Sequence, residues 1–105
     1  MVTVIARFKI QEGKQDEALE QLKKMTSAVE TQEQGVLAYM CHRSQNDPLE
    51  IVFVEIYSEA DVLQAHGETP HMKEFIANLG QFSDGSGASI ELMEPISGFT
   101  RGKGG

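Results

Sequence analysis

The chain has no tryptophan and only one cysteine, Cys41, among its 105 residues. A single cysteine cannot form a disulfide within the chain, and its scarcity fits a reducing compartment. Basic residues are also few, because 9 Lys and Arg stand against 16 Asp and Glu, for a formal net charge of −7. This balance argues against nucleic acid as a partner, since phosphate binding needs a surplus of Lys and Arg. It argues equally against a basic helix at a membrane surface.

Long apolar runs are missing as well. No stretch approaches the roughly 18 uninterrupted apolar residues of a transmembrane helix. Met1 leads directly into the apolar segment 2–5, without the charged region, long apolar core and cleavage site of a signal peptide. We therefore expect a soluble cytoplasmic protein with no membrane partner. The sequence also lacks a Gly-rich phosphate-binding loop, which limits the cofactor options.

Alternating apolar residues predict four β-strands. The predicted strands cover residues 2–10, 36–43, 50–57 and 88–95. Asn46-Asp47-Pro48 is typical of a turn, so the second and third strands are expected to form an antiparallel hairpin. In the fourth strand, Ile90 and Leu92 are expected to point inward.

Helical spacing predicts the elements between these strands. The first helix carries an apolar stripe of Ala18, Leu22, Met25 and Val29. A second helical region follows the third strand and is divided at Gly67. Its second part begins at Thr69-Pro70, because Thr is a good N-cap and Pro suits the first helical position.

The resulting order, β-α-β-β-α-β, predicts an α+β fold of the ferredoxin-like type, with a four-stranded antiparallel sheet and its helices on one face. We expect one domain over residues 1–97 and a flexible Gly-rich tail over residues 98–105. The third strand is apolar on both faces, with Val52 and Val54 opposite Phe53. A sheet that is apolar on both sides needs cover on both sides, and a second copy in a two-fold homodimer is the simplest cover.

Several segments together resemble the antibiotic biosynthesis monooxygenase domain. They include the opening residues 2–8 with Gly13-Lys14, the segment 35–39, and Glu55 in the third strand. The most specific segment is His66-Gly67-Glu68-Thr69-Pro70-His71, an H-x-x-T-P-H run that is typical of this domain. The resemblance covers about residues 2–96, nearly the whole chain.

This resemblance implies a dimeric α/β barrel of two ferredoxin-like subunits, joined through their sheets, each with a small pocket between sheet and helices. Relatives include cofactor-independent monooxygenases of phenols, quinol monooxygenases, haem-degrading enzymes and an isomerase of a phosphorylated compound. The haem-degrading branch uses a Trp and an Asn on the first strand, and this chain has no Trp and carries Ala6 and Arg7 there. The H-x-x-T-P-H-M-K run is closest to the quinol monooxygenase branch, although the isomerase branch also carries H-x-x-T-P-H.

The candidate catalytic residues are His66, His71 and Glu55. An imidazole titrates near neutral pH, which suits a general base, and a strand carboxylate facing inward can orient it. The candidate substrate-binding residues are Tyr39, Phe53, Tyr57, Met72 and Phe75.

Structural roles remain open for the same residues. His71 has the alternative of a surface position in a first helical turn, and His66 that of bonding a backbone carbonyl at a helix end. Glu55 has the alternative of holding the turn at residues 67–69 by accepting its backbone N–H groups. Tyr39 and Tyr57 have the alternative of core or interface positions.

A metal site is not expected, because His42, His66 and His71 lie on separate elements without an H-x-x-x-H pair. The function that we predict is oxidation of a small phenolic or quinol compound by O₂ without metal or organic cofactor. One alternative is an isomerase of a small carbonyl compound, with or without a phosphate group, which Arg43 or Arg7 in the cavity would favour. The other is a non-catalytic binding or stress-response module, which a cavity filled by Phe53, Met72 and Phe75 would favour.

Overall fold

The computed structural model describes residues 1–101. Its elements, in chain order, are β1 (Val2–Lys9), α1 (Gln15–Gln32), β2 (Val36–Arg43), β3 (Glu50–Tyr57), α2 (Ala60–Gly67), α3 (Pro70–Leu79) and β4 (Ser89–Met93). The four strands form one sheet in the order β2-β3-β1-β4, and all neighbouring pairs are antiparallel. The predicted ferredoxin-like order is therefore confirmed.

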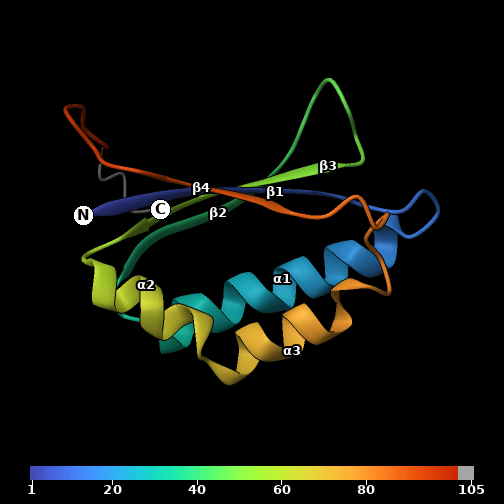
Figure 1. The fold of residues 1–105 in the computed structure, drawn as a ribbon, viewed down its shortest axis with the longest axis horizontal. Helices are drawn as coiled ribbons and strands as arrows, with labels where there is room; N and C mark the ends of the chain where they lie inside the picture. The colour runs from blue at the N-terminus through green and yellow to red at the C-terminus, as the bar shows by residue number, and fades with distance from the viewer. Residues whose placement is uncertain (102–105) are drawn as a thin grey trace.

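The three helices lie together on one face of the sheet (Figure 1). The apolar stripe predicted for α1 is buried against that face, and none of its four residues is more than 3% exposed. Between the layers lies an aromatic cluster in which Phe8, Phe75 and Phe82 contact one another with ring centroids 6.0 to 6.5 Å apart. This core fixes the position of α1 and α3 under the sheet.

Side chains of β3 alternate between the two faces of the sheet. Ile51, Phe53, Glu55 and Tyr57 face the helices and are at most 6% exposed. Val52, Val54 and Ile56 face the opposite side and are only half-buried. The side of the sheet away from the helices has no second layer in Figure 1. The two-faced pattern read from the sequence is thus present in the fold.

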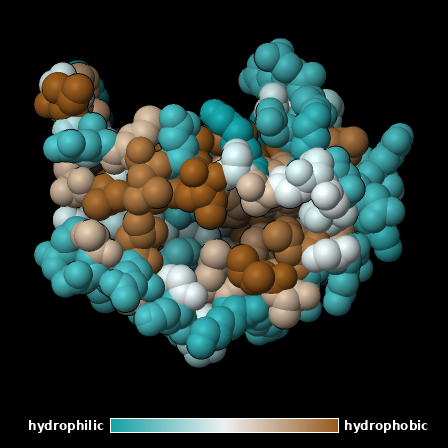
Figure 2. Space-filling model, in the orientation of Figure 1, coloured by the Kyte–Doolittle hydropathy of each residue, from teal (hydrophilic) through white to brown (hydrophobic). Residues whose placement is uncertain are grey.

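The fourth strand departs from the sequence prediction. It is shorter than expected, and Ile90 and Leu92 are 67% and 62% exposed rather than inward. Both pair with residues of β1 whose side chains face the helices, Ala6 and Val4. The helices, however, pack against β1, β2 and β3, so the edge strand β4 is left without cover on that side. Figure 2 shows the side of the molecule on which β4 lies in front, and hydrophobic side chains gather there.

The predicted tail falls partly beyond the described residues, which end at 101. Within the described part, Ile96 and Phe99 are 97% and 77% exposed. No helix among the described residues has the length and apolar character needed to span a membrane. A cytoplasmic location stays a prediction.

Gly35 lies where the end of α1 approaches the start of α2. A Cβ at this position would lie 2.8 Å from both methyl groups of Val62. The carbonyl of Gly35 also accepts a hydrogen bond from the N–H of Ser58, at 3.0 Å, which restricts any shift of the loop. We therefore expect Gly35→Ala to lower the free energy of unfolding by about 1–3 kcal/mol, as overpacking does elsewhere.

Gly80 provides the matched control for this substitution. Its φ of −63° suits any residue, and a Cβ there has no neighbour within 4 Å. Gly80→Ala should therefore leave stability unchanged or raise it by about 0.4–1 kcal/mol, because it restricts the unfolded chain. Urea unfolding of both variants measures the difference, and equal stabilities would contradict the close approach at Gly35.

Candidate active site

A buried carboxylate brings the two predicted histidines together. Oε1 of Glu33 lies 2.9 Å from Nδ1 of His66, and Oε2 lies 2.5 Å from Nε2 of His71. The side chains of Glu33, His66 and His71 are 8%, 5% and 14% exposed. The two alternative structural roles do not hold, because His66 bonds a carboxylate rather than a carbonyl and His71 is largely covered.

The break between α2 and α3 sets this geometry. α2 ends at Gly67, one residue after His66, and α3 begins at Pro70, one residue before His71. Thr69 caps α3 by accepting a hydrogen bond from the N–H of Met72, as its residue type predicts. The same hydroxyl donates to the carbonyl of His66, at 2.9 Å, and so ties the two helices together.

Glu33 was not among the residues singled out from the sequence. It follows α1 directly, and its N–H donates to the carbonyl of Val29. The carboxyl-terminal end of a helix carries partial negative charge, so a carboxylate there is unfavourable unless another group compensates it. The two imidazoles that bond to Glu33 supply that compensation. The only sign of this role in the sequence is the unfavourable position of an acid at the carboxyl-terminal end of a helix.

The hydrogen bonds to Glu33 define the tautomers of the two neutral imidazoles. A carboxylate only accepts, so each ring nitrogen facing it must carry the proton. Neutral His66 is therefore protonated on Nδ1, which leaves a lone pair on Nε2, and neutral His71 is protonated on Nε2. Among residues 1–101, neither Nε2 of His66 nor Nδ1 of His71 makes a hydrogen bond, so each imidazole is held by a carboxylate at one nitrogen and has a lone pair at the other, the arrangement of a general base.

Glu55 has a different partner from those expected. Its carboxylate accepts a hydrogen bond from the hydroxyl of Tyr57, at 2.5 Å, and the side chain is buried. The backbone N–H groups of residues 68 and 69 bond to carbonyls of α2, so Glu55 does not hold that turn. Neither does it make the hydrogen bond to histidine that was expected of it, which Glu33 makes instead.

Burial raises the pKa of Glu55 above its ordinary value of 4.5. The hydrogen bond from Tyr57 and the charge of protonated His66 oppose this rise, and the nearby Glu33 carboxylate adds to it. Burial likewise raises the pKa values of Tyr39 and Tyr57, so both phenols keep their protons at neutral pH.

The raised pKa of Glu55 predicts that the stability of the fold depends on pH. Between pH 4.5 and the raised pKa, the folded state holds a proton that the unfolded state has released, so stability falls as pH rises through this window. Glu55→Gln removes that fall and keeps an oxygen to accept from Tyr57. Free energies of unfolding measured from pH 4 to 8 should show that the stability of the variant, relative to that of the wild type, increases as pH rises. A constant difference, or the same trend for the exposed Glu20→Gln, would contradict the prediction.

Aromatic rings surround the buried cluster. The ring of His66 lies between those of Tyr39 and Tyr57, at centroid distances of 5.4 and 5.6 Å. Of the other predicted substrate-binding residues, Phe53 and Phe75 belong to the hydrophobic core and Met72 packs against it. These three side chains fill the interior where a pocket was expected, and their role in substrate binding stays a prediction.

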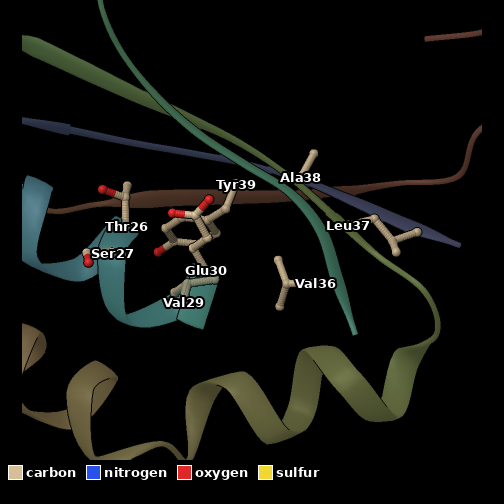
Figure 3. Close-up of a pocket in the computed structure, with 8 residues that line it drawn as sticks. All are labelled: Thr26, Ser27, Val29, Glu30, Val36, Leu37, Ala38 and Tyr39. Atoms are coloured by element: carbon tan, nitrogen blue, oxygen red, sulfur yellow. The ribbon is translucent and has the colours of Figure 1, made fainter. Parts of the chain in front are cut away.

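Open space lies instead between α1 and β2. One cavity of about 400 Å³ is bordered by the end of α1 and the start of β2 (Figure 3). A second cavity, of about 430 Å³, lies further along the same two elements. Thr26 and Tyr39 border both cavities, which we together call the α1–β2 groove. Tyr39 of β2 borders this groove (Figure 3), and its ring also contacts the ring of His66, at a centroid distance of 5.4 Å.

No group of three or more His, Cys, Asp or Glu suited to a metal ion occurs among residues 1–101. Burial raises the pKa of the Cys41 thiol to about 11, so a reactive thiolate is disfavoured at neutral pH. The titratable groups that the structure gathers here are the two histidines, the two acids and the two tyrosines.

Comparison with solved structures identifies similar proteins. An antibiotic biosynthesis monooxygenase is 25% identical, with a TM-score of 0.84 over 92% of this chain and 100% of that chain. A proposed antibiotic biosynthesis monooxygenase from Caulobacter crescentus is 27% identical, with a TM-score of 0.86 over 91% and 90% of the two chains. A protein from Mycobacterium tuberculosis, 23% identical with a TM-score of 0.84 over 94% and 98%, shows the same fold.

None of the curated proteins compared with the chain matches it. The family model described as antibiotic biosynthesis monooxygenase matches residues 1–78, a span that includes Glu33, Glu55 and both histidines of the buried cluster. The chain belongs to the antibiotic biosynthesis monooxygenase family.

Proposed function

We propose that the protein is a cofactor-independent monooxygenase that oxidises a small phenolic or quinol compound with O₂. The observation that carries the proposal is the Glu33–His66 hydrogen bond, which leaves Nε2 of a buried imidazole free to accept a proton. Family membership supports the reaction class, and the aromatic rings around His66 suit an aromatic substrate.

In this proposal, His66 starts the reaction by removing the phenolic proton. The resulting phenolate is electron-rich and transfers one electron to O₂. The superoxide and phenoxyl radical then combine at a ring carbon, and the peroxide takes a proton from His66. Loss of water leaves a quinone, so one oxygen atom of O₂ stays in the product and the other departs as water. Glu33 holds the imidazole in place and stabilises its protonated form.

Buried groups around the histidine suit this chemistry. Tyr57 keeps its proton and donates to Glu55, so this acid is paired when it is charged. A site that excludes water strengthens each charge interaction on the developing anion. His66 is 4% exposed, so the proposal requires the substrate to approach past Tyr39, the side chain shared by His66 and the α1–β2 groove.

Oxygen uptake tests the proposed function. Protein treated with a chelator and shown to be free of metal should consume O₂ with some members of a panel of hydroquinones and naphthols, one O₂ for each quinone formed. Heat-denatured protein provides the control for autoxidation. Uptake no faster than this control across the panel would contradict the proposal.

Arg43 supports an isomerase as the second candidate. Its side chain borders the α1–β2 groove, where it would suit a phosphorylated carbonyl compound, whereas Arg7 lies on the opposite face of the sheet. An isomerase exchanges a substrate C–H proton with solvent and consumes no O₂. Proton exchange followed by NMR in D₂O, without O₂ uptake, would favour it over the monooxygenase.

The filled interior supports a non-catalytic binding module as the third candidate. Phe53 and Phe75 occupy the space between sheet and helices, 4% and 9% exposed. Such a module would bind its ligand without changing it. Saturable binding with neither O₂ uptake nor proton exchange would favour this candidate over both enzymes.

We further propose that two copies associate through their sheets. The face opposite the helices carries Val54 at its centre, paired with Ile5 on β1 and with Met40 on β2, which is 59% exposed. Burying this apolar surface against a second copy gives the cover that the single chain lacks.

Light scattering at micromolar concentration should give twice the 11.6 kDa mass of the chain. Val54→Lys places a charge at the centre of the face and should give the single-chain mass with an unchanged circular dichroism spectrum. A wild type at 11.6 kDa would contradict the proposed association.

A further inference from the structure

One end of the α1–β2 groove has a charge opposite to that of the protein as a whole. Lys23 from α1 borders this end, together with His42 and Arg43 from β2. No Asp or Glu borders it, although the chain carries 16 acids against 9 Lys and Arg. Within the described part of the chain, neither Lys23 nor Arg43 forms an ion pair.

The floor of the same cavity is apolar. Leu19 and Leu22 border it from α1, and Cys41 and Ile51 border it from the sheet. Leu22 and Ile51 are 3% and 1% exposed, so the apolar surface that faces the cavity comes from the half-buried Leu19 and Cys41, which pack against the core. A cavity of about 430 Å³ is large enough for a two-ring aromatic compound.

The adjoining cavity has a different chemical character. Thr26 and Ser27 line it with hydroxyl groups, and Glu30 supplies a carboxylate. Figure 3 shows these α1 side chains across from Tyr39. The groove is thus cationic at one end and apolar in its middle, and beyond Tyr39 it is bordered by two hydroxyl groups and one carboxylate of α1.

We propose that the α1–β2 groove binds a small amphipathic anion, an aromatic compound with one carboxylate or similar acidic group. The acidic group lies between Lys23 and Arg43, the ring lies against Leu19 and Cys41, and a ring hydroxyl points toward Tyr39. Arg43 suits this role because its guanidinium binds a carboxylate through two hydrogen bonds. That the bound anion is also the substrate rests on the proposed function.

Calorimetry with a matched pair of compounds tests this binding site. The probes are 6-hydroxy-2-naphthoate and 2-naphthol, which differ by the carboxylate, and titration under argon prevents oxidation. We expect the naphthoate to bind about tenfold more tightly than the naphthol, the effect of one charge-assisted contact. Raising the salt concentration should reduce that preference.

A matched pair of double variants locates the contact. Lys23→Gln with Arg43→Gln should reduce naphthoate binding to the level of the naphthol and leave naphthol binding unchanged. Lys14→Gln with Lys73→Gln removes the same charge from exposed positions outside the groove and should preserve the preference. Equal affinities for the two probes in the wild type, no binding of either, or equal losses in both double variants would overturn the proposal.

Oxygen uptake separates this proposal from the proposed function. Selective binding of the naphthoate without O₂ uptake for any phenol would support the anion site and contradict the monooxygenase function. The opposite result is O₂ uptake with neutral hydroquinones that shows no preference for acids and is unchanged in the Lys23 and Arg43 double variant. That result would support the monooxygenase and contradict the anion site.

Discussion

His66→Ala should lower kcat/KM for oxidation of an accepted phenol by about 10²–10⁴-fold, the usual contribution of a general base. The reason is that Nε2 of His66 carries a lone pair while Glu33 holds its Nδ1, and that this side chain, 5% exposed, lies against the rings of Tyr39 and Tyr57. Added imidazole should restore part of the activity, because it can occupy the space of the missing ring and accept the proton. Oxygen uptake with and without imidazole measures both effects.

Two other substitutions control for this result. Gln64→Ala changes an exposed residue of the same helix and should leave kcat/KM unchanged. His71→Ala should cost less than His66→Ala, because Glu33 can still hold His66 through its other oxygen. Identical rates for the wild type and both histidine variants would remove these residues from the mechanism.

Glu33→Ala should lower the free energy of unfolding by about 2–5 kcal/mol. The substitution leaves two covered imidazole N–H groups without a partner, and each such group costs about 1–3 kcal/mol. It also removes the contact that joins the end of α1 to both α2 and α3. Urea unfolding monitored by circular dichroism measures the change.

Glu30→Ala is the matched control for Glu33. Glu30 is an exposed acid one turn earlier on α1, so its removal should change stability by no more than about 0.5 kcal/mol. In a chain that already carries His66→Ala and His71→Ala, the cost of Glu33→Ala should fall sharply, since the partners are gone. Equal effects of the two acid substitutions would mean that Glu33 does not hold the cluster.

Most of the fold could be predicted because local signals agree with tertiary packing. The stripe of α1 is buried, and the break at Gly67 with the Thr69 cap is present in the structure. The exposure of Ile90 and Leu92 could not be predicted in the same way. Alternation shows which residues share a face, but it does not show how far a helix layer extends across the sheet.

The two histidines that the structure brings together stand out in the sequence, whereas the carboxylate that joins them does not. His66 and His71 stand out through a local run, whereas Glu33 comes from 33 positions earlier in the chain than its first partner. The H-x-x-T-P-H run does not indicate the contact with Glu33, because only the packing of α1 against α2 and α3 creates this contact. Glu55 faces inward and is buried, and its hydroxyl partner, Tyr57, lies two residues away on the same strand face.

The central claim is that Glu33 holds two histidines in opposite tautomers and so leaves Nε2 of His66 free. Nitrogen-15 chemical shifts of the imidazoles, recorded at a pH where they are neutral, test it without any substrate. We predict a proton on Nδ1 of His66 and on Nε2 of His71, as the two hydrogen bonds to Glu33 require. A proton on Nε2 of neutral His66 would contradict the assignment of this residue as the base.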